Sequence, residues 1–207
     1  AIHRDIEITP DIRPIWGLDV ARFGTDKTAL CKRYGNVVTD IEAWQGLDLM
    51  QTVGRVMAEY DNLSPSLRPN EILVDSIGVG GGVVDRLREL GAPVRGINVG
   101  EAPAMGKTYM NLRSELWFKT KAWLEDRSCK LPKNDQLLAE LTGIRYAFTS
   151  AGKMKAESKD AMRKRGLKSP DLADALCLTM ASDAATALSG ASMSWNRSIK
   201  RNLKGIA

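Results

Sequence analysis

The alternation of apolar and polar residues predicts five β-strands, three of them close together near the start of the chain. The apolar runs that predict them span residues 14–22, 28–34, 37–44, 71–77 and 94–99. Gly35 and Asn36 stand between the second and third runs, and this pair is typical of a tight hairpin turn. The first three strands are therefore expected to be sequential neighbours in a sheet.

Elsewhere the sequence predicts helices, most clearly over residues 47–60, where apolar residues recur every three or four positions. These helical segments span residues 47–60, 83–90, 111–126 and 135–141, followed by a last helix from Ser169 to about residue 188. Ser169 is expected to cap this last helix, with Pro170 at its first position. The glycine-rich stretch 78–82 indicates a bend before the second helix, and residues 144–156 predict a basic β-hairpin.

The order of these elements predicts an α/β protein with a ribonuclease H-like fold. Short turns join the first three strands into an antiparallel meander, and two β-α units add parallel strands to the same sheet. Helices then flank this mixed sheet, and the basic β-hairpin is an insert. We expect residues 1–13 to be a linker or leader, 14–188 to form the domain, and 189–207 to be a disordered basic tail.

Composition excludes several classes of protein. A chain of 207 residues, 43% hydrophobic and 27% charged, fits one globular domain. No apolar run approaches the roughly 18–20 residues of a membrane span, and the charged start of the chain lacks the apolar core of a secretory signal. The single histidine, His3, and three widely separated cysteines argue against His-based triads, disulfide frameworks and zinc ribbons. Carboxylates must therefore carry any catalysis.

The net charge of +5 is unevenly distributed and points to a polyanionic partner. Residues 145–168 hold eight basic side chains against two acids, and residues 194–207 hold four basic side chains and no acid. The rest of the chain has a net charge of −5. Nucleic acid is the first candidate partner, although a solvated loop and a disordered tail would give the same charge pattern. The candidate DNA-binding residues are Lys153, Lys155, Lys159, Arg163, Lys164, Arg165 and Lys168.

Four aspartates occupy positions where a carboxylate needs a partner. Asp19 lies inside an apolar strand and Asp75 ends another, while Asp171 and Asp174 share one face of the last helix's first turn. Taken singly, Asp171 fits a helix N-terminus and Asp75 fits a hydrogen-bond acceptor at a strand end. If the two strands are neighbours and the helix crosses them, however, the four carboxylates converge. Oxygen-only ligands select Mg²⁺ or Mn²⁺, and two such ions can promote phosphodiester hydrolysis.

Two nearby features have weaker interpretations. Asp26 could hydrogen-bond to residues that ligate the metal, but it could equally be a turn residue. Lys27 could contact a phosphate or simply be exposed to solvent. Residues 106–108, Gly-Lys-Thr, resemble the end of a Walker A loop, yet Glu101 stands where the first glycine is required. We therefore expect no ATPase motif in this chain.

Three segments together resemble a known family. GLDVARFGTDKTAL (17–30), ILVDSIGVGGGVVDRL (72–87) and KSPDLADALCL (168–178) are similar to the acidic motifs of the nuclease domain of large terminase subunits from tailed bacteriophages. That family is similar in fold to ribonuclease H and RuvC-type resolvases. The resemblance implies that Asp19 and Asp75 ligate metal from adjacent strands, and that Asp174, with Asp171 alongside, completes the site. It also implies an endonuclease that uses two Mg²⁺ or Mn²⁺ ions to cut concatemeric viral double-stranded DNA with little sequence preference.

The resemblance further implies partners and a location. The implied partners are double-stranded DNA, an ATPase motor domain missing from this chain, the portal and the small terminase subunit. The implied location is the cytoplasm of an infected bacterium. The tail around Trp195 is a candidate for docking on the portal or on DNA. Two alternatives remain open: a RuvC-like junction resolvase built on the same four acids, and a non-catalytic DNA-binding or assembly module.

Overall fold

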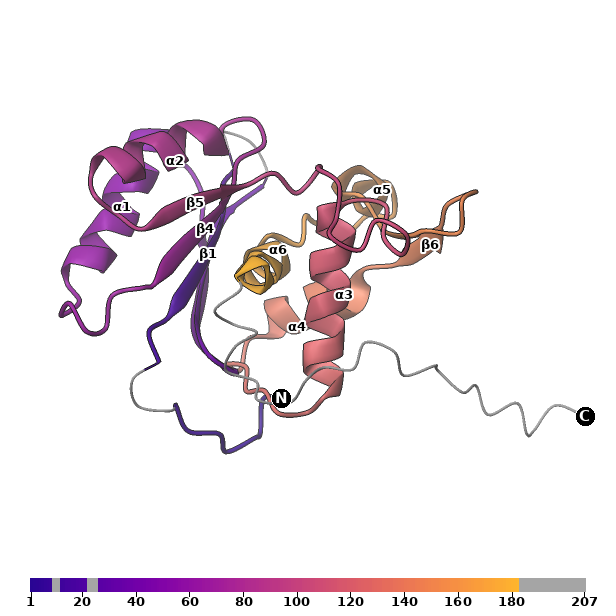
Figure 1. Cartoon of the computed structure of the whole chain (residues 1–207), viewed down its shortest axis with the longest axis horizontal. Coiled ribbons are helices and arrows are strands. Elements are labelled where there is room, and N and C mark those ends of the chain that lie inside the picture. Colours follow the sequence, from indigo (N-terminus) through magenta and orange to yellow (C-terminus); the bar gives the residue numbers. More distant parts are fainter. Residues whose placement is uncertain (9–11, 22–25, 183–207) are drawn as a thin grey trace, which may run out of the picture.

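The structure, a computed structural model, describes residues 1–8, 12–21 and 26–182 and is built on a five-stranded mixed sheet (Figure 1). The strands are β1 (Ile15–Asp19), β2 (Thr28–Tyr34), β3 (Val37–Trp44), β4 (Glu71–Asp75) and β5 (Val94–Ile97). Their order is β3-β2-β1-β4-β5, with antiparallel pairing in the meander β1–β2–β3 and parallel pairing of β1 with β4 and of β4 with β5. The predicted mixed sheet and ribonuclease H-like class are confirmed.

Helices cover both faces of the sheet (Figure 1). One face carries α1 (Leu49–Asp61) and α2 (Gly80–Glu89); the other carries α6 (Asp171–Leu178), with α3 (Leu112–Glu125) and α4 (Asp135–Gly143) packed outside it. The hairpin β6 (Tyr146–Phe148) and β7 (Met154–Ala156) and the short helix α5 (Lys159–Lys164) lie beside α3. A 3-10 turn (Thr179–Ala181) follows α6. In the described part of the chain, none of the helices is long and apolar enough to cross a membrane.

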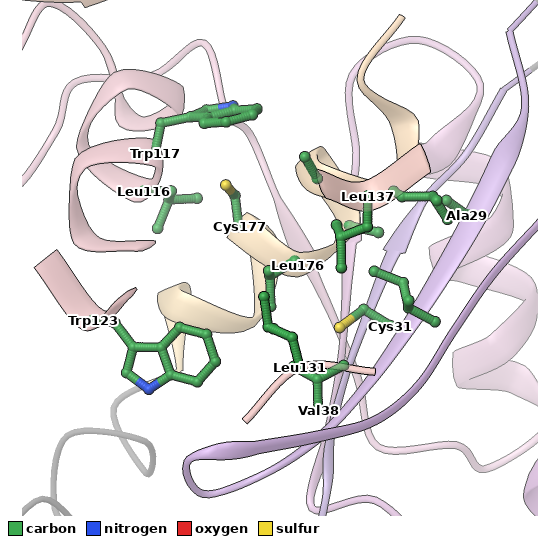
Figure 2. Packing of buried hydrophobic residues seen from close by; sticks show 14 of the residues in the cluster. Ala29, Cys31, Val38, Leu116, Trp117, Trp123, Leu131, Leu137, Leu176 and Cys177 are labelled. Carbon is green, nitrogen blue, oxygen red and sulfur yellow. The ribbon is translucent and has the colours of Figure 1, made fainter. Parts of the chain in front are cut away.

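Buried hydrophobic residues pack on both faces of the sheet, and strand alternation decides which face each strand residue joins. In β1, Trp16 and Leu18 join the core beneath α1 and α2. Gly17 and Asp19 therefore face α6. On that side, Leu176 and Cys177 of α6 lie between the sheet and α3, as Figure 2 shows.

Gly17 sets how closely α6 can approach the sheet. A Cβ atom at this position would overlap the carbonyl oxygen of Ala175 and would also lie 2.9 Å from the methyl group of Thr179. Only a glycine allows this approach, which brings the first turn of α6 beside the end of β1.

Replacing Gly17 with Ala is expected to destabilise the protein by about 3 kcal/mol, because a backbone carbonyl cannot move aside as a side chain can. The control is Gly54→Ala: Gly54 lies within α1, and a Cβ there would meet no described atom within 4 Å apart from the nearby backbone of its own helix. The control should stabilise the protein by roughly 0.5–1 kcal/mol through helix propensity and reduced freedom of the unfolded chain. Denaturant unfolding measures both, and equal effects would contradict the proposed packing role of Gly17.

Both ends of α6 are held by buried charged side chains. The guanidinium of Arg33 donates to the Oγ1 and carbonyl oxygen of Thr179, at 2.8 and 2.7 Å, just beyond the C-terminal end of the helix. At the other end, Oε2 of Glu140 accepts from the backbone N–H of Ala173 at 2.9 Å. These charges match the sign of the helix dipole at each end and so fix the helix that carries two of the four acids.

Several predicted boundaries differ from the structure. The helix α2 begins at Gly80, inside the predicted bend, and a Cβ atom at this position would overlap the carbonyl oxygen of Asp75. The prediction that Ser169 caps α6 is wrong: the N-cap is Pro170, which makes no side-chain cap bond, and Glu140 accepts from the N–H of Ala173 in the first turn instead. The helical part ends with the 3-10 turn, and residues 183–188 of the predicted helix lie outside the described residues, as does the predicted tail 189–207.

Candidate functional site

The four predicted acids lie at one edge of the sheet. Asp19 and Asp75 are the last residues of β1 and β4, and these strands pair in parallel, so both carboxyl ends meet there. Asp171 and Asp174 come from the first turn of α6, which crosses the sheet at this edge. A cleft of about 300 Å³ is lined by three of the acids, Asp19, Asp75 and Asp174.

Lys159 lies among three of these acids. Its Nζ is 2.8 Å from Oδ2 of Asp19, 3.4 Å from Oδ2 of Asp174 and 3.7 Å from Oδ1 of Asp171. The sequence placed Lys159 with the DNA-binding lysines, whereas its ammonium group points into the acid cluster. Lys159 is the first residue of α5, where the positive end of the helix dipole disfavours a cation unless acids face it; because the sequence did not predict this helix, it gave no sign of the inward position of Lys159.

Asp75 is held differently from the other acids. Its Oδ1 accepts a hydrogen bond from the backbone N–H of Ile77 at 3.1 Å, and its side chain is half-buried at the edge of the cleft. Among the described residues, Asp75 makes no ion pair with Lys159. The structure thus gathers Asp19, Asp171 and Asp174 around one ammonium group and leaves Asp75 beside them.

Asp171 has one satisfied oxygen and one unsatisfied oxygen. Its Oδ2 accepts from the backbone N–H of Lys27 at 2.8 Å. Its Oδ1 is buried without a hydrogen-bond partner in the described chain, although the ammonium of Lys159 lies near it. Lys27 thus contacts the acids through its backbone, and Asp26 forms an ion pair with Arg163 of α5.

Asp174 is held by two donors from α3 that the sequence did not reveal. The indole Nε1 of Trp117 donates to Oδ1 at 2.7 Å, and Nη2 of Arg113 lies 3.0 Å from Oδ1 and 3.3 Å from Oδ2. These residues stand about 60 positions before Asp174, and no local pattern connects them to it. Their contact depends on how α3 packs against α6.

Burial and mutual repulsion perturb the acids. Burial raises the pKa of Asp19 to about 7, and the charges of Asp174 and Asp171 add to this, outweighing the attraction of Lys159. Burial also raises the pKa of Asp75 and of Asp171. For Lys159, burial lowers the pKa, but the charges of Asp19 and Asp174 outweigh it and leave the pKa raised. The cluster therefore favours a bound cation.

The donor set fits a hard divalent cation. Within the described ranges, no three His, Cys, Asp or Glu side chains are close enough together to hold a metal ion. At the acid cluster, the ammonium group of Lys159 lies between the carboxylates. All the candidate ligands are nonetheless carboxylate oxygens, which Mg²⁺ and Mn²⁺ prefer. The buried Oδ1 of Asp171 accepts no hydrogen bond from a described residue, and burial raises the pKa of Asp19; both indicate a site that gains from more positive charge.

The predicted DNA-binding residues fall into two groups besides Lys159. Arg163 pairs with Asp26 and Asp160, and Arg165 pairs with Glu157, so both arginines are engaged within the protein. The remaining four make no ion pair with any described residue: Lys153, Lys155, Lys164 and Lys168. Lys155 of β7 lines the cleft itself, so the basic hairpin lies next to the acids.

Comparison with known proteins identifies the fold. No family model and no curated protein matches the sequence. Among solved structures, the nuclease domain of the large terminase subunit gp2 of bacterial virus Sf6 matches with a TM-score of 0.69 and 23% identity, over 82% of this chain and 88% of that one. The large terminase nuclease of thermophilic phage G20c, solved with bound magnesium, matches with a TM-score of 0.64 and 18% identity, over 83% of this chain and 82% of that one. The fold is therefore that of phage large-terminase nuclease domains, as the three acidic motifs predicted.

Proposed function

We propose that this protein is a metal-dependent endonuclease that cuts double-stranded DNA. The observation that carries the proposal is the gathering of buried Asp19, Asp171 and Asp174 around a single cation position, with Asp75 beside them. A cluster of like charges at this depth is unfavourable unless cations neutralise it. The shared fold with phage terminase nuclease domains supports the same activity.

The four acids would hold two Mg²⁺ or Mn²⁺ ions. Such ions, when bound, activate a water molecule and stabilise the leaving oxygen of a phosphodiester. The protein itself supplies the rest: β1, β4 and α6 orient the carboxylates, and Lys153, Lys155, Lys164 and Lys168 would bind the DNA backbone beside them. Contacts to phosphates carry no sequence information, which suits cutting with little sequence preference.

The biological role we propose is the cutting of concatemeric viral DNA during genome packaging. The two structural neighbours named above are nuclease domains of large terminase subunits, which supports this role. In this role the domain would work with an ATPase motor domain and would meet the portal and the small terminase subunit, in the cytoplasm of the infected bacterium.

Incubation of the protein with supercoiled plasmid, linear duplex and a four-way junction tests the activity. With Mn²⁺ or Mg²⁺ we expect nicking and linearisation of plasmid at many sites, and no cutting when a chelator is added. Strong preference for the junction over linear duplex would favour the resolvase alternative. Salt-sensitive DNA binding without cleavage in either metal would favour a binding or assembly module.

Neutralising two of the free lysines should weaken DNA binding without preventing cleavage. Each lost phosphate contact lowers the slope of log affinity against log salt by about 0.9, so Lys164→Ala with Lys168→Ala should lower it by about 1.8. Fluorescence anisotropy on a duplex, in chelator to prevent cutting, measures the slope. The matched control replaces Lys121 and Lys133, two exposed lysines outside residues 145–168. An equal change in the control would argue against a DNA-binding role for this segment.

A further inference from the structure

Asp174 differs from the other acids in having its orientation fixed from a second helix. Trp117 is buried, and the only polar atom of its side chain, Nε1, donates to Oδ1 of Asp174 at 2.7 Å. The Nη2 of Arg113, one helical turn earlier in α3, adds a bond of 3.0 Å to the same oxygen and a longer one of 3.3 Å to Oδ2. Oδ1 therefore accepts two hydrogen bonds from α3.

The other oxygen of Asp174 points toward the remaining acids. Oδ2 lies 3.4 Å from the Nζ of Lys159, the ammonium that also contacts Asp19. With Oδ1 engaged by α3, the carboxylate cannot rotate without breaking the bond to Trp117. Oδ2 is therefore the oxygen available to a ligand in the cleft.

Arg113 also links Asp174 to the basic segment. Its Nη1 donates to the carbonyl oxygen of Glu157 at 2.7 Å, and Glu157 lies two residues before Lys159 and directly after β7. The guanidinium thus holds the backbone that carries Lys155 and Lys159 against the same carboxylate. The side chain is also partly covered by the ring of Trp117, whose centroid is 5.7 Å from its Cζ.

We propose that Trp117 and Arg113 are positioning residues, which hold Asp174 so that a divalent cation is met by Oδ2 alone. The inference rests on the proposed function, since it assigns these residues a task in the same metal site. Donors that orient a metal-binding carboxylate raise metal affinity by fixing its direction in advance, and their removal lowers that affinity by about 10–100-fold.

The test compares Trp117→Phe with Trp123→Phe and measures Mn²⁺ binding directly, from the electron paramagnetic resonance signal of free Mn²⁺. Trp123 is an ideal control: it lies in the same helix, is equally buried, and donates its Nε1 to Asn36 at 2.8 Å, away from the acids. We expect the Mn²⁺ dissociation constant to rise by about tenfold in Trp117→Phe and to stay within about twofold of the wild type in Trp123→Phe. DNA affinity in chelator should be unchanged in both variants.

A second pair of variants separates positioning from packing. Arg113→Met removes the donors and the charge, whereas Arg113→Lys keeps the charge and one donor group, so the lysine variant should recover part of the lost Mn²⁺ affinity. In a manganese-soaked crystal of the wild type, Asp174 should contact the ion through one oxygen only.

The outcomes distinguish this inference from the proposed function. If the wild type binds and cuts with Mn²⁺ but Trp117→Phe and Trp123→Phe bind it equally, the positioning role is wrong and the nuclease assignment stands. A bidentate Asp174 in the crystal would also overturn the positioning role. If the wild type binds no Mn²⁺, the metal site itself is wrong and the inference falls with it.

Discussion

The Asp19→Asn variant is expected to lose DNA cleavage by at least about 100-fold while remaining folded. Asp19 is the most central of the acids: it is buried, it ends β1, and its Oδ2 makes the shortest contact to Lys159. Asn has nearly the same shape but only one oxygen and no charge, so it is a poor ligand for Mg²⁺ or Mn²⁺. Loss of transition-state stabilisation by several kcal/mol corresponds to two or more orders of magnitude in rate.

The same substitution should change how stability depends on pH. Burial raises the pKa of Asp19 to about 7, above the value of 3.8 that an unfolded chain shows. Between these two values the folded state binds more protons than the unfolded state, so the stability of the wild type falls as pH rises and levels off above about pH 7. The free energy of unfolding of Asp19→Asn relative to the wild type should therefore increase by about 3 kcal/mol from about pH 5 to about pH 8.

Plasmid cleavage in Mn²⁺ and urea unfolding at the two pH values measure these effects. The matched control is Asp85→Asn, which changes an exposed acid of α2 whose ion pair, among the described residues, is with Arg88 of the same helix. It should leave cleavage unchanged and alter stability by less than about 1 kcal/mol. Undiminished cutting by Asp19→Asn would remove this acid from the proposed site, whatever its effect on stability.

The sequence predicted that four acids converge, but it did not predict the residues that contact them. Asp19 and Asp75 stand out in the sequence because burying a charged carboxylate at the end of an apolar strand costs free energy unless a partner compensates for it. Arg113 and Trp117 could not be found in this way, since each is an ordinary residue of a predicted helix until α3 packs on α6. Gly17 is similar: nothing in its neighbourhood in the sequence shows that Ala175 lies against it.

The count of basic residues in the segment 145–168 assigned Lys159 to the DNA-binding lysines, whereas its ammonium group lies among the acids. A sum over residues 145–168 treats every lysine alike, although the direction in which a side chain points depends on the fold. The short helix α5, absent from the predicted elements, turns Lys159 inward and leaves Lys164 exposed. The fold class could be predicted because it follows from the order of strands and helices; the pairing of charges depends on geometry across elements more than 100 residues apart.

The Lys159→Met variant is expected to be destabilised in the absence of divalent metal and to regain stability when Mg²⁺ is added. Methionine keeps the apolar stem but leaves Asp19, Asp171 and Asp174 without the ammonium group. Removing one partner from a buried ionic cluster costs about 3–5 kcal/mol. The loss should shrink as pH falls, because Asp19, whose pKa is already about 7 beside the lysine, then carries a proton instead of a charge.

Magnesium should stabilise Lys159→Met more than the wild type, because in the wild type the ion competes with the ammonium group for the same carboxylates. Lys164→Met is the control: Lys164 belongs to the same helix but is exposed and makes no ion pair with a described residue. Thermal unfolding with and without Mg²⁺ separates the two roles that Lys159 could have. As a DNA contact alone, Lys159→Met would weaken DNA binding as Lys164→Met does and leave stability unchanged in either condition. As the counter-ion of the acid cluster, it would lower the unfolding temperature without metal, and the metal would restore it.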